Sequence, residues 1–182
     1  MNTETVLFNK DNLKFTRKGS NHYSLEFIIE NNNIELSKII DFNIIKLIHS
    51  LNNDIYEKVN LDKKDDNNAT VTILIKNFFE DVGLPQYFVH VDVTKNNTDD
   101  YILFEAQSNN EKPQDIPKDI MQMKIYKLTT KCDIITNNKM SIVTNVVFDN
   151  KIKVPLFVEK MASLILNKIF KRLKQFIENL TL

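Results

Sequence analysis

Hydrophobic and polar residues alternate with a period of two over several short segments of this chain. A strand places successive side chains on opposite faces, so this alternation is typical of strands that bury one face. The turns between the segments contain asparagine, aspartate or proline, and such short connections favour antiparallel hairpins over parallel crossovers. The pattern predicts strands over residues 23–29, 71–76, 87–93, 101–106, 121–135 and 142–148.

Two segments follow a helical period instead. Between residues 34 and 58, isoleucines recur every three or four positions, and Asp41 or Asn43 is a suitable cap for a break into two short helices. Residues 155–180 carry a longer amphipathic pattern, which Pro155 opens because the first turn of a helix tolerates proline. Such a helix packs on the sheet or on another protein. Its apolar stripe is Val158, Met161, Ala162, Ile165, Ile169, Leu173, Phe176, Ile177 and Leu180.

The order of these segments predicts an α+β fold. We expect a curved antiparallel sheet of about six or seven strands wrapped around the long C-terminal helix, with a short helical pair after the first strand. Residues 61–68 are charged and rich in asparagine, which indicates a connection. Residues 1–20 are expected to form either an N-terminal arm or an extra edge strand. Nothing in the pattern indicates a second domain, so residues 1–182 are taken as one.

The charge balance gives no global attraction to nucleic acid or to an anionic membrane. Lys and Arg together number 24, as do Asp and Glu. Residues 151–180 contain seven Lys or Arg against Glu159 and Glu178, a local excess of five. This excess either supports transient contact between the helix and a membrane surface or forms a solvated outer face. Nucleic acid is not an expected partner, because aromatic residues are not interleaved with these charges.

The chain has a single cysteine, Cys132, which rules out an internal disulfide bond and favours a reducing compartment. The first ten residues lack the pattern of a secretory signal. No apolar run approaches the ~20 residues that cross a bilayer as a helix. These features together predict a cytoplasmic location.

No sequence motif indicates a catalytic site, a metal or a cofactor. His90 and Asp92 are two positions apart, so a strand places them on one face, either as an acid–base pair or as part of a solvated surface. His22 and His49 fall in unrelated segments, and three scattered histidines do not have the spacing of a metal site. We therefore expect no metal ligands and no resident cofactor.

The C-terminal region resembles a known superfamily. The strand sequence VTNVVF at 143–148, a turn, and the sequence VPLFV at 154–158 are similar to the last strand and the lid-helix opening of START/Bet v 1-like proteins. This superfamily is also called SRPBCC or helix-grip. The resemblance implies a curved sheet that grips the C-terminal helix around an apolar cavity. Members typically bind lipids, sterols or other hydrophobic molecules, and some are cyclases or chaperone-binding modules.

The first functional hypothesis is non-enzymatic binding or transfer of a small hydrophobic ligand, such as a lipid, between the sheet and the helix. A protein-interaction module without a cavity is the second, since a filled core uses the same residue types as a pocket. The third is a cyclase-type enzyme, which requires His90, Asp92 and Tyr101 to converge inside. The residues expected to line the cavity are Ile73, Ile75, Tyr87, Val89, Val91, Phe104, Met123, Ile125, Val146, Met161, Ile165 and Ile169.

Overall fold

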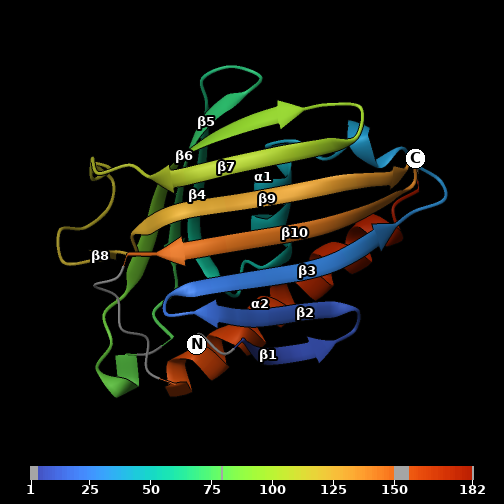
Figure 1. Ribbon diagram of the computed structural model, residues 1–182. Helices are drawn as coiled ribbons and strands as arrows, with labels where there is room; N and C mark the ends of the chain where they lie inside the picture. The colour runs from blue at the N-terminus through green and yellow to red at the C-terminus, as the bar shows by residue number, and fades with distance from the viewer. Residues whose placement is uncertain (1–3, 79, 150–155, 182) are drawn as a thin grey trace.

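The computed structural model of the protein describes residues 4–78, 80–149 and 156–181 (Figure 1). Its described strands form one sheet of ten strands, in the order β1-β2-β3-β10-β9-β7-β6-β5-β4, with the short β8 beside β6. Every pairing is antiparallel except that of β8 with β6. The strands are β1 Thr5–Lys10, β2 Leu13–Gly19, β3 His22–Glu30, β4 Tyr56–Lys63, β5 Asn68–Ile75, β6 Tyr87–Asn97, β7 Tyr101–Ser108, β8 Met121–Gln122, β9 Ile125–Thr136 and β10 Lys139–Phe148.

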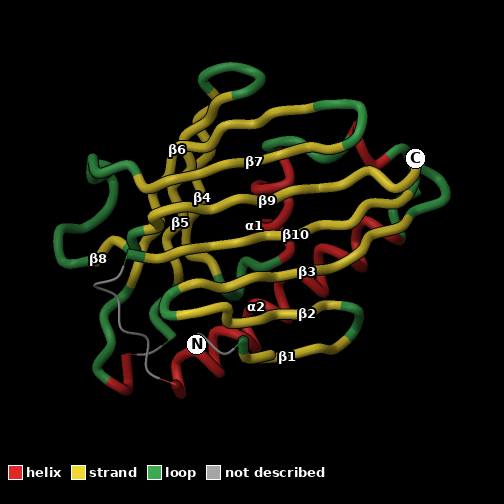
Figure 2. The backbone as a smooth tube through the Cα atoms, in the orientation of Figure 1, coloured by secondary structure: helices red, strands yellow, loops and turns green. Residues whose placement is uncertain are grey.

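Within the described residues, two α-helices lie on the same side of this sheet (Figure 1). They are α1, Asn43–Leu51, and the long α2, Leu156–Glu178; short 3-10 turns occur at η1, Leu36–Lys38, and η2, Glu80–Val82. Strands β4, β5 and β6 curl around behind the flatter part of the sheet, towards the side that holds α1 and α2 (Figure 2). The sheet therefore has a concave face, which the helices cover, and a convex face.

The strand register shows which side chains share the concave face. Leu25 pairs with Thr144, Thr144 with Thr130, and Thr130 with Phe104, so these four residues form one row across β3, β10, β9 and β7. Leu25 and Phe104 belong to the main core cluster. Residues two positions along each strand lie on the same face, so the apolar face of the sheet is the one that faces the helices.

The C-terminal half of α2 completes the core. Ile169, Leu173 and Ile177 are each less than 5% exposed, and they recur on one face of the helix as the apolar stripe predicts. The Phe170 ring lies 5.6 Å from the Phe27 ring, measured between centroids. Under the other helix, Phe42 makes an edge-to-face contact with Phe104 on β7. Both helices are thus fixed to the sheet through buried rings and aliphatic side chains.

The convex face carries a second, smaller core. Leu74 and Phe88 lie on adjacent strands there, and they pack with Ile116 and Ile120 from the loop between β7 and β8. This loop, residues 109–120, connects two of the predicted strands. It covers the convex side of β5 and β6, because those strands have apolar side chains on both faces.

The structure confirms the predicted fold class and corrects its details. The sheet has more strands than the expected six or seven. The first 20 residues supply two of them, β1 and β2, so the helical pair follows the third strand. The helical pattern over 34–58 ends at Leu51, and β4 begins at Tyr56, within the segment read as helix and connection. β4 is an edge strand with many charged side chains, which protect the edge of the sheet from pairing with another chain. The same charged residues obscure the alternation of β4 in the sequence. Pro155 lies outside the described residues.

Candidate ligand-binding site

The concave face divides into a buried half and a partly exposed half. The buried half, here called the closed half, carries Phe27, Ile29, Cys132, Met140 and Ile142, all less than 9% exposed. In the rest of the concave face, buried side chains such as Tyr23, Ile125 and Val91 lie beside four side chains that are only partly buried, although they pack against the core. We call this part the open half, and it consists of Ile73, Val89, Leu128 and Val146.

Helix α2 follows the same division. Its C-terminal half presents large apolar side chains to the closed half, whereas its first half buries Glu159 and Ser163. Ile165 and Leu166 on that first half are only partly buried. The first half of α2 therefore does not insert the fully buried aliphatic side chains that would pack the open half tightly.

A partly buried ion pair joins the first half of α2 to the sheet. Arg17 Nη1 donates to Oε2 of Glu159 at 3.0 Å and to Oε1 at 3.2 Å, and the Glu159 side chain is 5% exposed. Tyr23 lies beside this pair. Burial and the neighbouring Glu159 carboxylate raise the pKa of the Tyr23 hydroxyl to about 12, so it stays protonated. The polar cluster of Arg17, Glu159 and Tyr23 is therefore paired within the protein, and its positive and negative charges balance.

A second polar group lies on the concave face itself. The Oγ1 atoms of Thr130 on β9 and Thr144 on β10 are 2.9 Å apart. Both threonines are partly exposed, and the register places them between Cys132 and Ile142 on one side and Leu128 and Val146 on the other. The hydroxyl pair thus marks the boundary between the closed and the open half.

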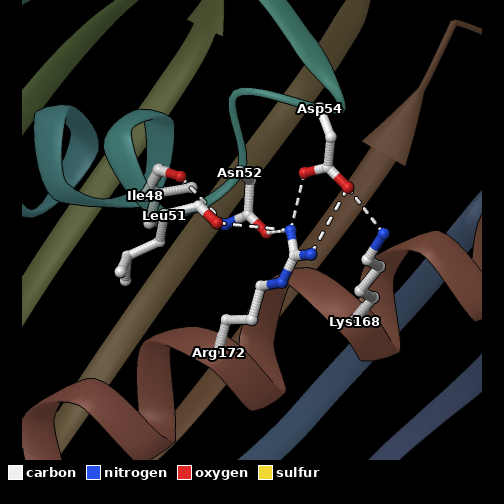
Figure 3. A network of polar contacts seen from close by, with 6 residues as sticks. All are labelled: Ile48, Leu51, Asn52, Asp54, Lys168 and Arg172. Carbon is white, nitrogen blue, oxygen red and sulfur yellow. Dashed lines mark hydrogen bonds and ion pairs between the residues drawn. The ribbon is translucent and has the colours of Figure 1, made fainter.

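Polar contacts fix the C-terminal half of α2 at several points. Arg172 donates to Asp54 at 2.6 Å, to the Asn52 side chain at 3.1 Å and to the Leu51 carbonyl, and Lys168 also contacts Asp54 (Figure 3). The neighbouring Arg172 and Lys168 hold the pKa of Asp54 well below its usual range. Asn31 Nδ2 donates to the Ile177 carbonyl at 2.6 Å. The helix is therefore anchored most strongly where it covers the closed half.

The expected cavity residues occupy several environments. Ile73, Val89 and Val146 lie in the open half, and Ile165 lies on the first half of α2. Val91, Phe104, Ile125 and Ile169 are buried in the interior, whereas Met161 is 44% exposed on α2. Ile75, Tyr87 and Met123 are partly exposed near the ends of β5, β6 and β8. That these residues contact a ligand stays a prediction.

Sequence reasoning missed several residues around the open half. Thr144 is two positions from Val146, so the strand alternation would have found it. Leu128 and Thr130 are three and five positions from Ile125, across a register shift in β9, so alternation counted from Ile125 places them on the wrong face. Arg17 gave no such signal, because residues 1–20 were expected to form either an arm or an extra edge strand. Its partner Glu159 was counted only among the charges of the helix. The pairing joins residues 142 positions apart, which no local pattern reports.

The groups that a cyclase-type enzyme requires do not enter the interior. His90 and Asp92 share the convex face with Phe88, where His90 Nδ1 lies 2.9 Å from Thr72 Oγ1 and Asp92 accepts from Thr70 at 2.7 Å. Tyr101 alternates with Ile102 and so also faces away from the helices. Within the described residues, no group of three His, Cys, Asp or Glu side chains is placed to hold a metal ion.

A separate surface hollow of about 260 Å³ lies where β7 ends and β9 begins. Polar side chains supply most of its lining, including Gln107, Lys124 and Tyr126, and Tyr126 is 76% exposed. The expected cavity residue Ile125 also borders it. Because apolar ligands favour mainly apolar walls, this hollow suits them less well than the open half does.

Comparison with solved structures identifies the fold. The lipid transfer and protein localization domain of human StarD13 (DLC2) superposes with a TM-score of 0.70 at 12% identity, over 99% of this chain and 91% of that one. Human STARD10 gives a TM-score of 0.72 at 10% identity, over 96% and 72%. A STAR-related lipid transfer protein from Xanthomonas axonopodis gives 0.66 at 10% identity, over 96% and 98%.

No family model and no curated protein sequence matches this chain. At identities this low, the structural likeness concerns the fold alone. The chain has the START/Bet v 1-like helix-grip fold, as the resemblance of residues 143–158 predicts.

Proposed function

We propose that this helix-grip protein binds a small hydrophobic ligand, such as a lipid, between the open half of the concave face and the first half of α2. The observation that carries the proposal is the partial exposure of apolar side chains on the enclosed side of the sheet. Val146 and Leu128 pack against the core cluster but remain accessible to solvent. The lipid-transfer proteins that share the fold support this reading.

The energetics favour an apolar occupant. Each Å² of apolar surface that a ligand removes from water contributes about 25 cal/mol. The closed half is already covered by Ile169, Leu173 and Ile177, so a ligand gains this contribution at the open half. The polar groups beside it are paired with one another, so a hydrophobic ligand need not strip water from an unpaired charge.

Native mass spectrometry tests the proposal directly. The purified protein is incubated with a total lipid extract, separated from free lipid and weighed under native conditions. We expect an added mass of one lipid per chain, which organic solvent then releases for identification. If the protein takes up no lipid from the extract and none from its expression host, the proposal is wrong.

The exposed side of α2 supports transient contact with a membrane surface during ligand exchange. Phe157, Met161 and Leu164 are 49%, 44% and 67% exposed, and their spacing of four and three residues places them on one face of the helix. Lys160, next to Met161, is exposed, whereas Lys168 on the same helix is paired with Asp54. Apolar side chains beside an exposed cation suit an anionic lipid surface. No described helix has an apolar window long enough to cross a bilayer.

The same exposed stripe favours a second candidate, a protein-interaction module that carries no ligand. In that case the stripe of Phe157, Met161 and Leu164 would contact a protein partner. The mass measurement separates the two functions, because the interaction module takes up no lipid.

A further inference from the structure

The Thr130–Thr144 pair interrupts an otherwise apolar row. Across the concave face, Thr144 is flanked by Leu25, which is 3% exposed, and Thr130 by Phe104, which is 9% exposed. Valine has nearly the shape of threonine and suits a strand equally well. The sheet itself therefore does not require the two hydroxyl groups at this boundary.

The pair retains hydrogen-bonding capacity. Each threonine hydroxyl has one donor hydrogen and two acceptor lone pairs. The 2.9 Å contact between Thr130 and Thr144 uses one hydrogen, and the described residues provide no acceptor for the other. Because both side chains are partly exposed on the open side, this hydrogen and the remaining lone pairs are available to a ligand.

The charges around the site disfavour an anionic group next to this pair. A buried carboxylate or phosphate is costly unless a cation pairs with it. Arg17 has both of its short contacts with the buried Glu159, whose own negative charge would repel a ligand anion. Concave-face cations of β2, β4 and β6 are already engaged, Arg17 with Glu159, Lys63 with Asp41 and Lys95 over the ring of Phe42.

We propose that the ligand is an uncharged amphiphile whose hydroxyl group hydrogen-bonds to the Thr130–Thr144 pair, while its apolar body covers Leu128 and Val146. The inference rests on the proposed function and adds to it the chemical class of the ligand. Such a ligand carries an uncharged hydroxyl group on either a hydrocarbon chain or a fused ring system. The site discriminates against an analogue that replaces the hydroxyl with a negative charge, because among the described residues of the concave face no free cation is present to pair with a buried anion.

Displacement of the uncharged dye Nile red tests whether the ligand is an uncharged, hydroxyl-bearing amphiphile. The competitors are two pairs with matched apolar bodies, 1-dodecanol against dodecanoate and cholesterol against cholesterol sulfate, at about pH 7.5, where both acids are ionised. We expect the alcohol of at least one pair to displace the dye at a concentration about tenfold lower than its ionised counterpart. The pair that competes identifies the apolar body as a chain or a ring.

Variants connect the preference to the two threonines. Thr130→Val and Thr144→Val are each expected to weaken alcohol binding by about threefold to tenfold, after correction for each variant's own affinity for Nile red. Thr129→Val is the matched control, because Thr129 is the adjacent residue on the opposite face of β9 and pairs with Asn145. It should leave both affinities unchanged.

The outcomes separate the two proposals. One outcome is that Nile red binds but the ionised competitors bind as tightly as the alcohols, or that none of the four competes. In either case the proposed ligand class is wrong, while the proposed hydrophobic binding site is retained. The class is also wrong if both threonine variants bind the alcohol as the parent protein does. If the protein takes up no Nile red, the proposed function is wrong and this inference goes with it.

Discussion

Arg17 and Glu159 are separated by 142 positions in the chain, yet their side chains meet at 3.0 Å between the second strand and the first turn of α2. The contact ties the less strongly anchored half of the helix to the sheet. Glu159 is 5% exposed, whereas Arg17 is 32% exposed, so the carboxylate depends on the arginine for its pairing.

Replacing Arg17 should therefore destabilise the protein. In Arg17→Met the buried carboxylate loses its cation, and we expect the free energy of unfolding to fall by about 2–3 kcal/mol. Urea denaturation measures this change. The double variant Arg17→Met/Glu159→Met removes both charges and should recover at least half of the loss. Equal stabilities for the single variant and the parent protein would show that the pair contributes nothing.

The stability of the protein should depend on the charge of Asp54. The pKa of this carboxyl is lowered by Arg172 and Lys168, so its contribution is present above the pKa of an unfolded aspartate, ~3.9, and is lost as the pH falls towards the folded pKa. Asp54 is 42% exposed, which limits the effect to about 0.5–1 kcal/mol. Asp54→Asn should be less stable than the parent by this amount near pH 7, and by less near pH 3. A difference that grows towards acid pH would contradict the assignment.

The two faces of α2 should respond differently to truncation. Leu173 is 4% exposed and packs in the core, so Leu173→Ala should lower the free energy of unfolding by about 2–5 kcal/mol. Leu164 is 67% exposed, and Leu164→Ala should change it by less than about 0.5 kcal/mol. Chemical denaturation of both variants checks the orientation of the helix. A large loss in Leu164→Ala would mean that this side chain is covered in solution.

The exposed stripe on α2 should govern contact with anionic vesicles. Leu164→Ser removes an apolar side chain from the stripe, and we expect binding to phosphatidylserine-containing vesicles in a sedimentation assay to weaken by about tenfold. Ile135→Ser is the matched control, since Ile135 is 53% exposed at the far end of β9. If both variants bind vesicles equally well, the stripe is not the contact surface.

The single thiol should be unreactive in the native protein. Cys132 is 2% exposed, and burial raises the pKa of its thiol to about 12, so the reactive thiolate is scarce. A chromogenic disulfide reagent at about pH 8 should modify it only as fast as the protein unfolds, and immediately in denaturant. Rapid native labelling would show that the closed half opens readily.

Local patterns in the sequence predicted most of the fold. The alternation over β3, β5, β6, β7, β9 and β10 and the stripe of α2 each recur within a few residues, so they are visible without the structure. Strand β4 was missed because its charged residues obscure the period. The first two strands were not predicted as a pair, because the pattern of residues 1–20 fits either an arm or a single edge strand.

The candidate site was less predictable than the fold. Ile73, Val89 and Val146 follow from alternation alone, since the apolar side of a strand is its interior side. The division between the closed and open halves does not, because it depends on where α2 lies along the sheet. The Arg17–Glu159 pair and the partly exposed threonine pair arise from contacts between distant segments. A sequence without an alignment contains no direct signal of such contacts.

Nile red titration of the parent protein and of Val146→Trp tests the central claim most directly. Val146 lies in the open half between Tyr23 and Leu128, and a tryptophan there would fill the proposed site. Val143→Trp, on the opposite face of the same strand, is the control. We predict that the parent and the control each bind one dye per chain and that Val146→Trp, while still folded, binds at least about tenfold more weakly. Equal dye binding by all three proteins would place the dye elsewhere and contradict the account.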